Sequence, residues 1–182
     1  MTTKNILRNN YSARLSSSHK NSGGFTLVET LVAISILLVA VVGPISLIGD
    51  ALHKLYYAKD EMVAINLAEE GIEAVRQVRD SNMLTATAWD TGLGAGDYVV
   101  NANSATSVAF CGLTCAVQPV YLDAQGFYQQ STVLTATPFG RIVTITSIGT
   151  DERVVTSKVT WRTGGDIGNI SVTEYLFKWA LP

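Results

Sequence analysis

The most unusual side chain of the sequence is Glu29, a lone carboxylate inside the apolar run Phe25–Ile48. The run exceeds the roughly 20 residues that a membrane-spanning helix needs. A charged side chain within such a helix costs about 2.5–3.5 kcal/mol on insertion scales, and more if it stays unpaired. We therefore expect Glu29 to have a partner.

The two cysteines, Cys111 and Cys115, lie four residues apart in Cys-Gly-Leu-Thr-Cys. An oxidising compartment would favour a disulfide between them, and two reduced thiols are the alternative. A zinc site needs about four ligands, whereas the two histidines, His19 and His53, are remote in sequence. The sequence therefore predicts no metal site and no cofactor, and it leaves the disulfide and the free thiols open.

The remaining polar patterns do not predict an enzyme. No histidine follows His53, which excludes Ser-His and Cys-His nucleophile pairs from the C-terminal part. Asp123 and the adjacent Asp151 and Glu152 fall in predicted turns, where acidic residues usually face solvent. The pattern Gly92-x-Gly94-x-Gly96 has the wrong spacing for the dinucleotide fingerprint and predicts a flexible loop.

The charges are distributed unevenly along the chain. Residues 1–24 contain Lys4, Arg8, Arg14 and Lys20 and no acidic residue. Without these four, the 13 basic side chains fall to nine, against 15 acidic ones in residues 25–182, a net charge of −6. The basic flank predicts a cytoplasmic N-terminus by the positive-inside rule, and the acidic remainder argues against nucleic acid as a partner.

The elements that position Glu29 belong to one long predicted helix, Phe25–Asp80. Its first part, to Ile48, carries a few polar residues that can bond to the helix backbone, and Pro44 should kink or loosen it. From Gly49 the pattern becomes amphipathic. The predicted sheet-facing stripe consists of Leu52, Leu55, Tyr56, Met62, Ile65, Ala68, Ile72, Val75 and Arg79.

Three further features of this second helical part and its end lead to predictions. Gly71 costs about 1 kcal/mol relative to alanine in a helix, so close packing is its expected reason. Arg76 and Asp80 are four residues apart and could form an ion pair. Ser81 and Asn82 should end the helix.

Residues 81–116 are rich in predicted loops, with one short strand at Asp97–Val100. Strands predicted by β-branched and alternating residues then follow at 117–122, 127–130, 141–148, 153–162 and 170–179. Short turns join them, so we expect an antiparallel sheet. Its predicted core includes Trp161, Tyr175, Phe177 and Trp179.

The predicted fold class is thus α+β: a long helix, membrane-spanning in its first half and amphipathic in its second, packed on a C-terminal antiparallel head. The expected segments are a basic leader at 1–24, a spanning helix at 25–48, its amphipathic continuation at 49–80 and the head at 81–182.

The segment Gly24-Phe25-Thr26-Leu27-Val28-Glu29 resembles the prepilin signature of type IV pilins and type II secretion pseudopilins. The segment 66–76 and Phe139-x-Arg141-x-Val143 look like the I- or V-type minor members. The resemblance implies that a prepilin peptidase cuts after Gly24 and methylates the new N-terminus, Phe25. It also implies that Glu29 takes part in subunit assembly.

The resemblance further implies a structural, non-enzymatic subunit of a type IV pilus, competence pilus or type II secretion pseudopilus. Its partners would be the peptidase, the membrane and other pilin subunits. The protein would cross the cytoplasmic membrane once, with the head exported, and end in a surface or periplasmic filament. The alternative is a signal-anchored exported binding domain that does not polymerise.

Overall fold

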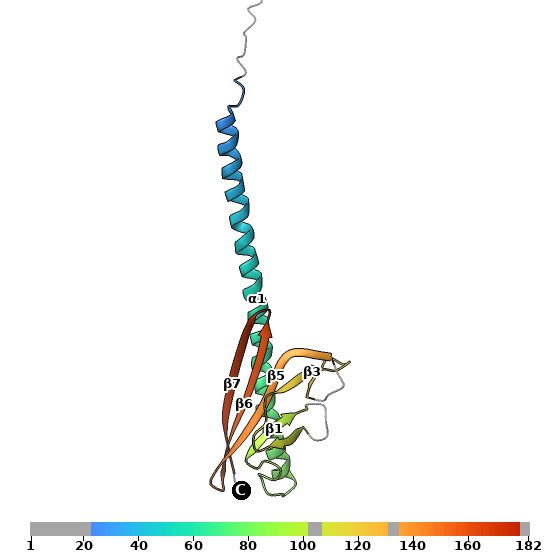
Figure 1. Cartoon of the computed structure of the whole chain (residues 1–182). Coiled ribbons are helices and arrows are strands. Elements are labelled where there is room, and N and C mark those ends of the chain that lie inside the picture. Colours follow the sequence, from blue (N-terminus) through green and yellow to red (C-terminus); the bar gives the residue numbers. More distant parts are fainter. Residues whose placement is uncertain (1–22, 102–106, 131–134, 179–182) are drawn as a thin grey trace, which may run out of the picture. The chain divides into compact units, whose positions relative to one another are not determined.

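The computed structural model describes residues 23–101, 107–130 and 135–178. The chain divides after Leu47 into two compact units. One helix, α1 (Leu27–Leu84), contributes residues to both of them, and the strands belong to the second unit (Figure 1). This is the predicted combination of a long apolar helix and a C-terminal antiparallel sheet.

In the first unit α1 starts at Leu27 because Thr26 caps it. The N–H of Glu29 donates to Thr26 Oγ1 at 3.2 Å, and the N–H of Thr30 donates to the Thr26 carbonyl at 3.1 Å. A threonine followed three residues later by a glutamate is a frequent helix start. All side chains from Gly23 to Leu47 are exposed, and the helix is long and apolar enough to cross a membrane.

The hydroxyl groups within the apolar run are satisfied by the helix itself. Those of Thr30, Ser35 and Ser46 each donate to a carbonyl three or four residues earlier, at 2.8 Å. This confirms the prediction that polar residues here bond back to the backbone. The helix continues through Pro44, so the proline does not end it.

The second unit is built on one antiparallel sheet of seven strands. The strands are β1 (Gly96–Val100), β2 (Val108–Gly112), β3 (Gln118–Leu122), β4 (Tyr128–Gln129), β5 (Thr135–Ile148), β6 (Glu152–Thr163) and β7 (Asp166–Phe177). β5 is central. It pairs with β6 on one edge, and β1 and β3 share its other edge. β7, β2 and β4 lie outside β6, β1 and β3 respectively.

The predicted antiparallel sheet is confirmed: β5, β6 and β7 pair consecutively, and the β3–β4 hairpin extends the sheet on the other edge of β5. Two details are wrong. β5 begins at Thr135, well before the predicted Arg141, and runs through Pro138. The strand β2 falls within residues expected to be loop. It pairs only with β1, and such a short edge strand carries too few residues for a clear alternating pattern.

The helix also ends later than predicted, at Leu84 instead of Asp80. Asn82 does not stop it, because its side chain bonds outside the helix. Its amide donates to the carbonyl groups of Thr91 at 2.8 Å and Trp89 at 3.2 Å. This residue therefore fastens the following loop to the last helical turn.

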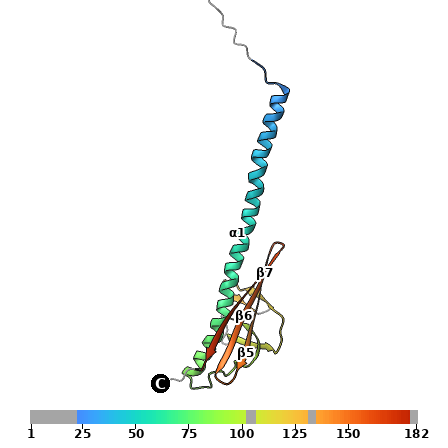
Figure 2. The ribbon, with the colours of Figure 1, turned by 90° about the vertical axis from the view of Figure 1, so that its left-hand side faces the viewer.

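The second part of α1 covers one face of the sheet, as Figure 2 shows. Its buried residues are Ala64, Leu67, Ala68, Gly71, Ile72, Ala74 and Val75. The predicted stripe is correct at Ala68, Ile72 and Val75, which are buried, and Ile65 and Arg79 are half-buried. It is wrong at four positions, which are exposed: Leu52, Leu55, Tyr56 and Met62. Small residues, which let the sheet approach closely, select the contact face more than large apolar ones do.

Gly71 demonstrates this close approach. A Cβ at this position would overlap Ser157 Oγ and lie 3.1 Å from Val143 Cγ2. The prediction that close packing explains the glycine is therefore confirmed.

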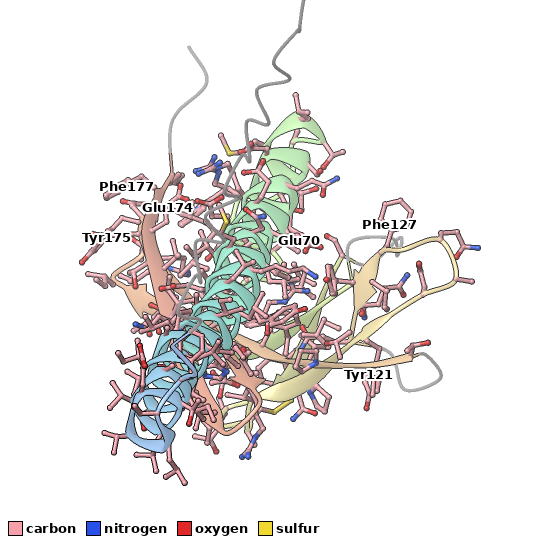
Figure 3. All side chains as sticks on the ribbon, turned by 90° about the horizontal axis from the view of Figure 1, so that it is seen from above. Glu70, Tyr121, Phe127, Glu174, Tyr175 and Phe177 are labelled. Atoms are coloured by element: carbon pink, nitrogen blue, oxygen red, sulfur yellow. A yellow bond between two sulfur atoms is a disulfide. The ribbon has the colours of Figure 1, made fainter. Side chains whose placement is uncertain are left out.

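The core between α1 and the sheet consists of two clusters of buried side chains. One surrounds Val75, Trp89, Val143, Val155 and Leu176, and the other surrounds Leu67, Val120, Phe139, Val159 and Trp161. Trp161 is thus in the core as predicted, and Trp179 lies outside the described residues. Tyr175 and Phe177 are half exposed on the face of β7 turned away from α1 (Figure 3), so their prediction as core residues is wrong.

Candidate functional site

Gly24 and Phe25 lie in an exposed, non-helical stretch immediately before α1. Residues 23–26 have no regular secondary structure. Nothing lies within 4 Å of a Cβ placed on Gly23 or Gly24, and the Phe25 side chain is 80% exposed. A non-helical, unobstructed backbone is what a peptidase needs in order to bind and cut a chain.

Glu29 lies in the first turn of α1, four residues after Phe25. The N-terminal end of a helix carries a partial positive charge and favours a carboxylate there. No ion pair of Glu29 occurs among the residues that the structure describes. The carboxylate is exposed and is free to meet a group of another molecule.

Cys111 and Cys115 form a disulfide at the end of β2, with their Cα atoms 6.2 Å apart. Asp97 holds this loop. The N–H of Cys115 donates to Asp97 Oδ2 at 2.7 Å, and the Thr144 hydroxyl donates to Asp97 Oδ1 at 2.6 Å. The cysteines belong to the second unit, so they are structurally separate from the Gly24–Glu29 segment of the first.

A buried cation that was not among the predicted site residues is Arg141 on β5, which is 0% exposed. Its guanidinium donates to the Leu67 carbonyl at 3.0 Å, the Val100 carbonyl at 2.9 Å and Gln130 Oε1 at 3.3 Å. It also forms an ion pair with Glu70 at 3.3 Å. One side chain therefore connects α1, β1 and the residue after β4 to the central strand.

Burial lowers the pKa of Arg141, and the adjacent Glu70 carboxylate opposes that effect. The sequence does contain a signal for this site. Arg141 follows Phe139 and precedes Ile142 and Val143 in an apolar strand, where a lone arginine is best explained by a buried set of acceptors.

A second ionic group fastens β7 to α1. Arg76 donates to both carboxylate oxygens of Glu174 at 2.6 Å and also bonds to Glu73. The hydrogen bond to Glu174 is the main reason why the pKa of Arg76 is raised. The predicted Arg76–Asp80 pair is wrong, because Asp80 accepts from Arg79 instead, at 2.7 Å. The acceptor that folding brings to Arg76 lies on β7, 98 residues away in the sequence.

Arg76, Glu73 and Glu174 line an open groove of about 510 Å³ between α1 and β7. Asn66, Glu69 and Glu70 also line it. Among the described residues, no three His, Cys, Asp or Glu side chains are arranged to hold a metal ion. The groove therefore lies between α1 and β7, and its described residues form no set of metal ligands.

The family model for the prokaryotic N-terminal methylation motif matches residues 19–43. No curated protein and no solved structure matches the chain. The matched segment contains Gly24, Phe25 and Glu29 and the beginning of α1. The chain therefore carries the N-terminal signature of type IV pilins and pseudopilins, in a pilin-like combination of one long apolar helix and an antiparallel sheet.

Proposed function

We propose that this protein is a structural subunit, of the minor type, of a type IV pilus, competence pilus or type II secretion pseudopilus. A prepilin peptidase cuts the precursor after Gly24 and methylates the amino group of Phe25. The observation that carries the proposal is the match to the methylation motif, whose Gly24 lies in an exposed, non-helical stretch directly before α1.

The first unit supports an assembly role through its surface. Its helical residues are all exposed and most of them are apolar, and water is a poor solvent for such a surface. While the subunit is in the membrane, lipid covers this surface, with the N-terminus in the cytoplasm and the sheet outside. In the filament, the corresponding helices of neighbouring subunits replace the lipid.

Glu29 then sets the axial position of each subunit. A carboxylate in the bilayer is costly, and its cost falls when it meets a cation in the same medium of low dielectric constant. The methylated ammonium of Phe25 on a neighbouring subunit is such a cation. The carboxylate and the amino group come from different copies, so their pairing joins two subunits at a defined offset.

The test is mass spectrometry of the mature N-terminus, in cells that contain the native peptidase. We expect a chain that begins at methylated Phe25. Gly24→Leu and Gly23→Leu are matched variants, because both glycines are equally unobstructed. We expect the first variant to keep its leader and the second to be cut. An intact leader in the wild type would contradict the proposal. It would favour a signal-anchored binding domain that does not polymerise.

A further inference from the structure

The turn between β6 and β7 is held against α1 close to the end of the apolar run. His53 Nε2 and Asp166 Oδ2 are 2.7 Å apart, and the Thr163 hydroxyl donates to Asp60 Oδ2 at 2.6 Å. One step further along the hairpin, Trp161 packs against a tyrosine of α1, with ring centroids 5.7 Å apart. These contacts fix the height of the turn along the helix.

That height can be related to the apolar run, since Ile48 and His53 are both in the second unit. Five helical residues at 1.5 Å each place His53 about 8 Å along α1 from the end of the run. The polar interface of a bilayer is roughly 5–8 Å thick on each side, given a 30 Å hydrocarbon core within about 40–45 Å in total. With Ile48 at the outer end of the hydrocarbon core, the turn beside His53 lies at the level of the outer headgroups.

The surface at this height has the composition of a membrane-interface site. A shallow groove of about 490 Å³ is lined by His53, Lys54, Tyr57, Asp166 and Ile167. Ile167 is 66% exposed, although it is a large apolar side chain beside a charged turn. Aromatic and long cationic side chains are enriched where proteins cross the headgroup region.

The groove also matches the charges of a phospholipid headgroup. Lys54 offers a cation for a phosphate, Asp166 offers a carboxylate for an ammonium, and Ile167 offers an apolar contact for the first carbons of an acyl chain. We propose that the β6–β7 turn docks on the outer surface of the bilayer while the subunit is still in the membrane. This rests on the proposed function in one respect, that the apolar run spans the membrane.

The experiment measures the environment of the turn in full-length protein, at one chain per phosphatidylethanolamine–phosphatidylglycerol nanodisc. A nitroxide is attached to Ile167→Cys. The matched control is Thr150→Cys, an exposed residue in the β5–β6 turn at the opposite end of β6. The native cysteines are in a disulfide and do not react with the label. Accessibility to oxygen, relative to a water-soluble nickel chelate, reports contact with lipid.

We expect this ratio to be several-fold higher at position 167 than at position 150. Asp166→Ala should lower the ratio at 167 towards that at 150, because it removes the bond to His53. Equal, water-like ratios at both sites would overturn the docking, and a ratio unaffected by Asp166→Ala would overturn the role of the His53–Asp166 bond. A neighbouring subunit cannot account for a high ratio, since each disc holds one chain.

The outcome is separable from that of the proposed function. Leader removal and filament formation are measured in cells, whereas the nanodisc measurement needs neither. A processed and assembled protein with a water-exposed turn would refute only the docking, and a docked turn on an unprocessed chain would refute only the pilin-like function.

Discussion

The two parts of α1 differ in whether their side chains are buried within the chain. From Leu27 to Leu47 no described side chain is buried, whereas further along the same helix seven residues are buried against the sheet. The first part is rich in exposed Leu, Ile and Val, whereas four of the seven buried positions of the second are alanine or glycine. Alanine and glycine are therefore frequent where α1 contacts the sheet, and under the proposed function lipid or other subunits cover the exposed apolar residues of the first part.

The strongest way to break this comparison is to remove the one charge of the first part. In Glu29→Ala we expect cleavage after Gly24 to persist and incorporation into filaments to fall by at least about tenfold, equivalent to 1.4 kcal/mol. The measurement is the amount of protein in sheared filaments. Asp50→Ala, which removes another acidic residue of α1 just beyond the apolar run, is the control and should assemble. Normal filaments from Glu29→Ala would contradict the assembly role.

The largest effect on folding should come from Arg141, which holds the second part of α1 to the sheet. Arg141→Ala removes the guanidinium from Glu70 and from the Leu67 and Val100 carbonyl groups, and Gln130 Oε1 keeps only the N–H of Val100. We expect a loss of about 3–5 kcal/mol. Denaturant unfolding of the full-length protein in detergent would measure it. Arg162→Ala, at an exposed position on β6, should change stability by less than about 0.5 kcal/mol. Equal losses in the two variants would contradict the role of Arg141.

Two glycines of α1 sharpen the comparison directly. Gly71→Ala overpacks the contact with Ser157 and Val143 and should cost about 1–3 kcal/mol. Gly49→Ala has nothing within 4 Å and should be neutral or stabilise the helix by up to about 1 kcal/mol. The same unfolding measurement applies to both.

Ser157→Ala provides a second step, because Ser157 Oγ is buried without a hydrogen-bond partner among the described residues. The double variant Gly71→Ala/Ser157→Ala should recover part of the loss. No recovery would mean that Ser157 is not the obstacle.

The smallest expected effect is on alkaline stability. Burial raises the pKa of Tyr98, whose hydroxyl donates to the Gly94 carbonyl at 2.8 Å. Below the unfolded-state pKa of about 10, the Tyr98 hydroxyl is protonated in both the folded and the unfolded chain. Above it the unfolded chain ionises first, so stability falls as the pH rises. Unfolding at pH 9 and pH 11 should show this slope in the wild type and a shallower one in Tyr98→Phe. An unchanged slope in the variant would assign the effect to other groups.

Much of the sheet could be predicted because alternation along β6 and β7 has period two. In β6, the alternating residues Val155, Ser157, Val159 and Trp161 are all buried. The same alternation misplaced Tyr175 and Phe177, since it specifies which residues share a face but not which of the two faces the helix covers; in β7 the covered face carries Leu176, which is buried. The edge strand β2 was missed because its pairing partner, not its own pattern, defines it.

By itself, the sequence determined the processing motif, the apolar run, the charge asymmetry and the α+β order of elements, because these depend on residue type and local spacing. Only the tertiary structure decided what depends on distant partners. Arg141 became the buried link between α1 and β5, Arg76 took Glu174 instead of Asp80, and the β6–β7 turn came to lie beside His53. In each case the choice follows from which groups folding brings within hydrogen-bond distance, and that distance is not encoded by neighbours in the chain.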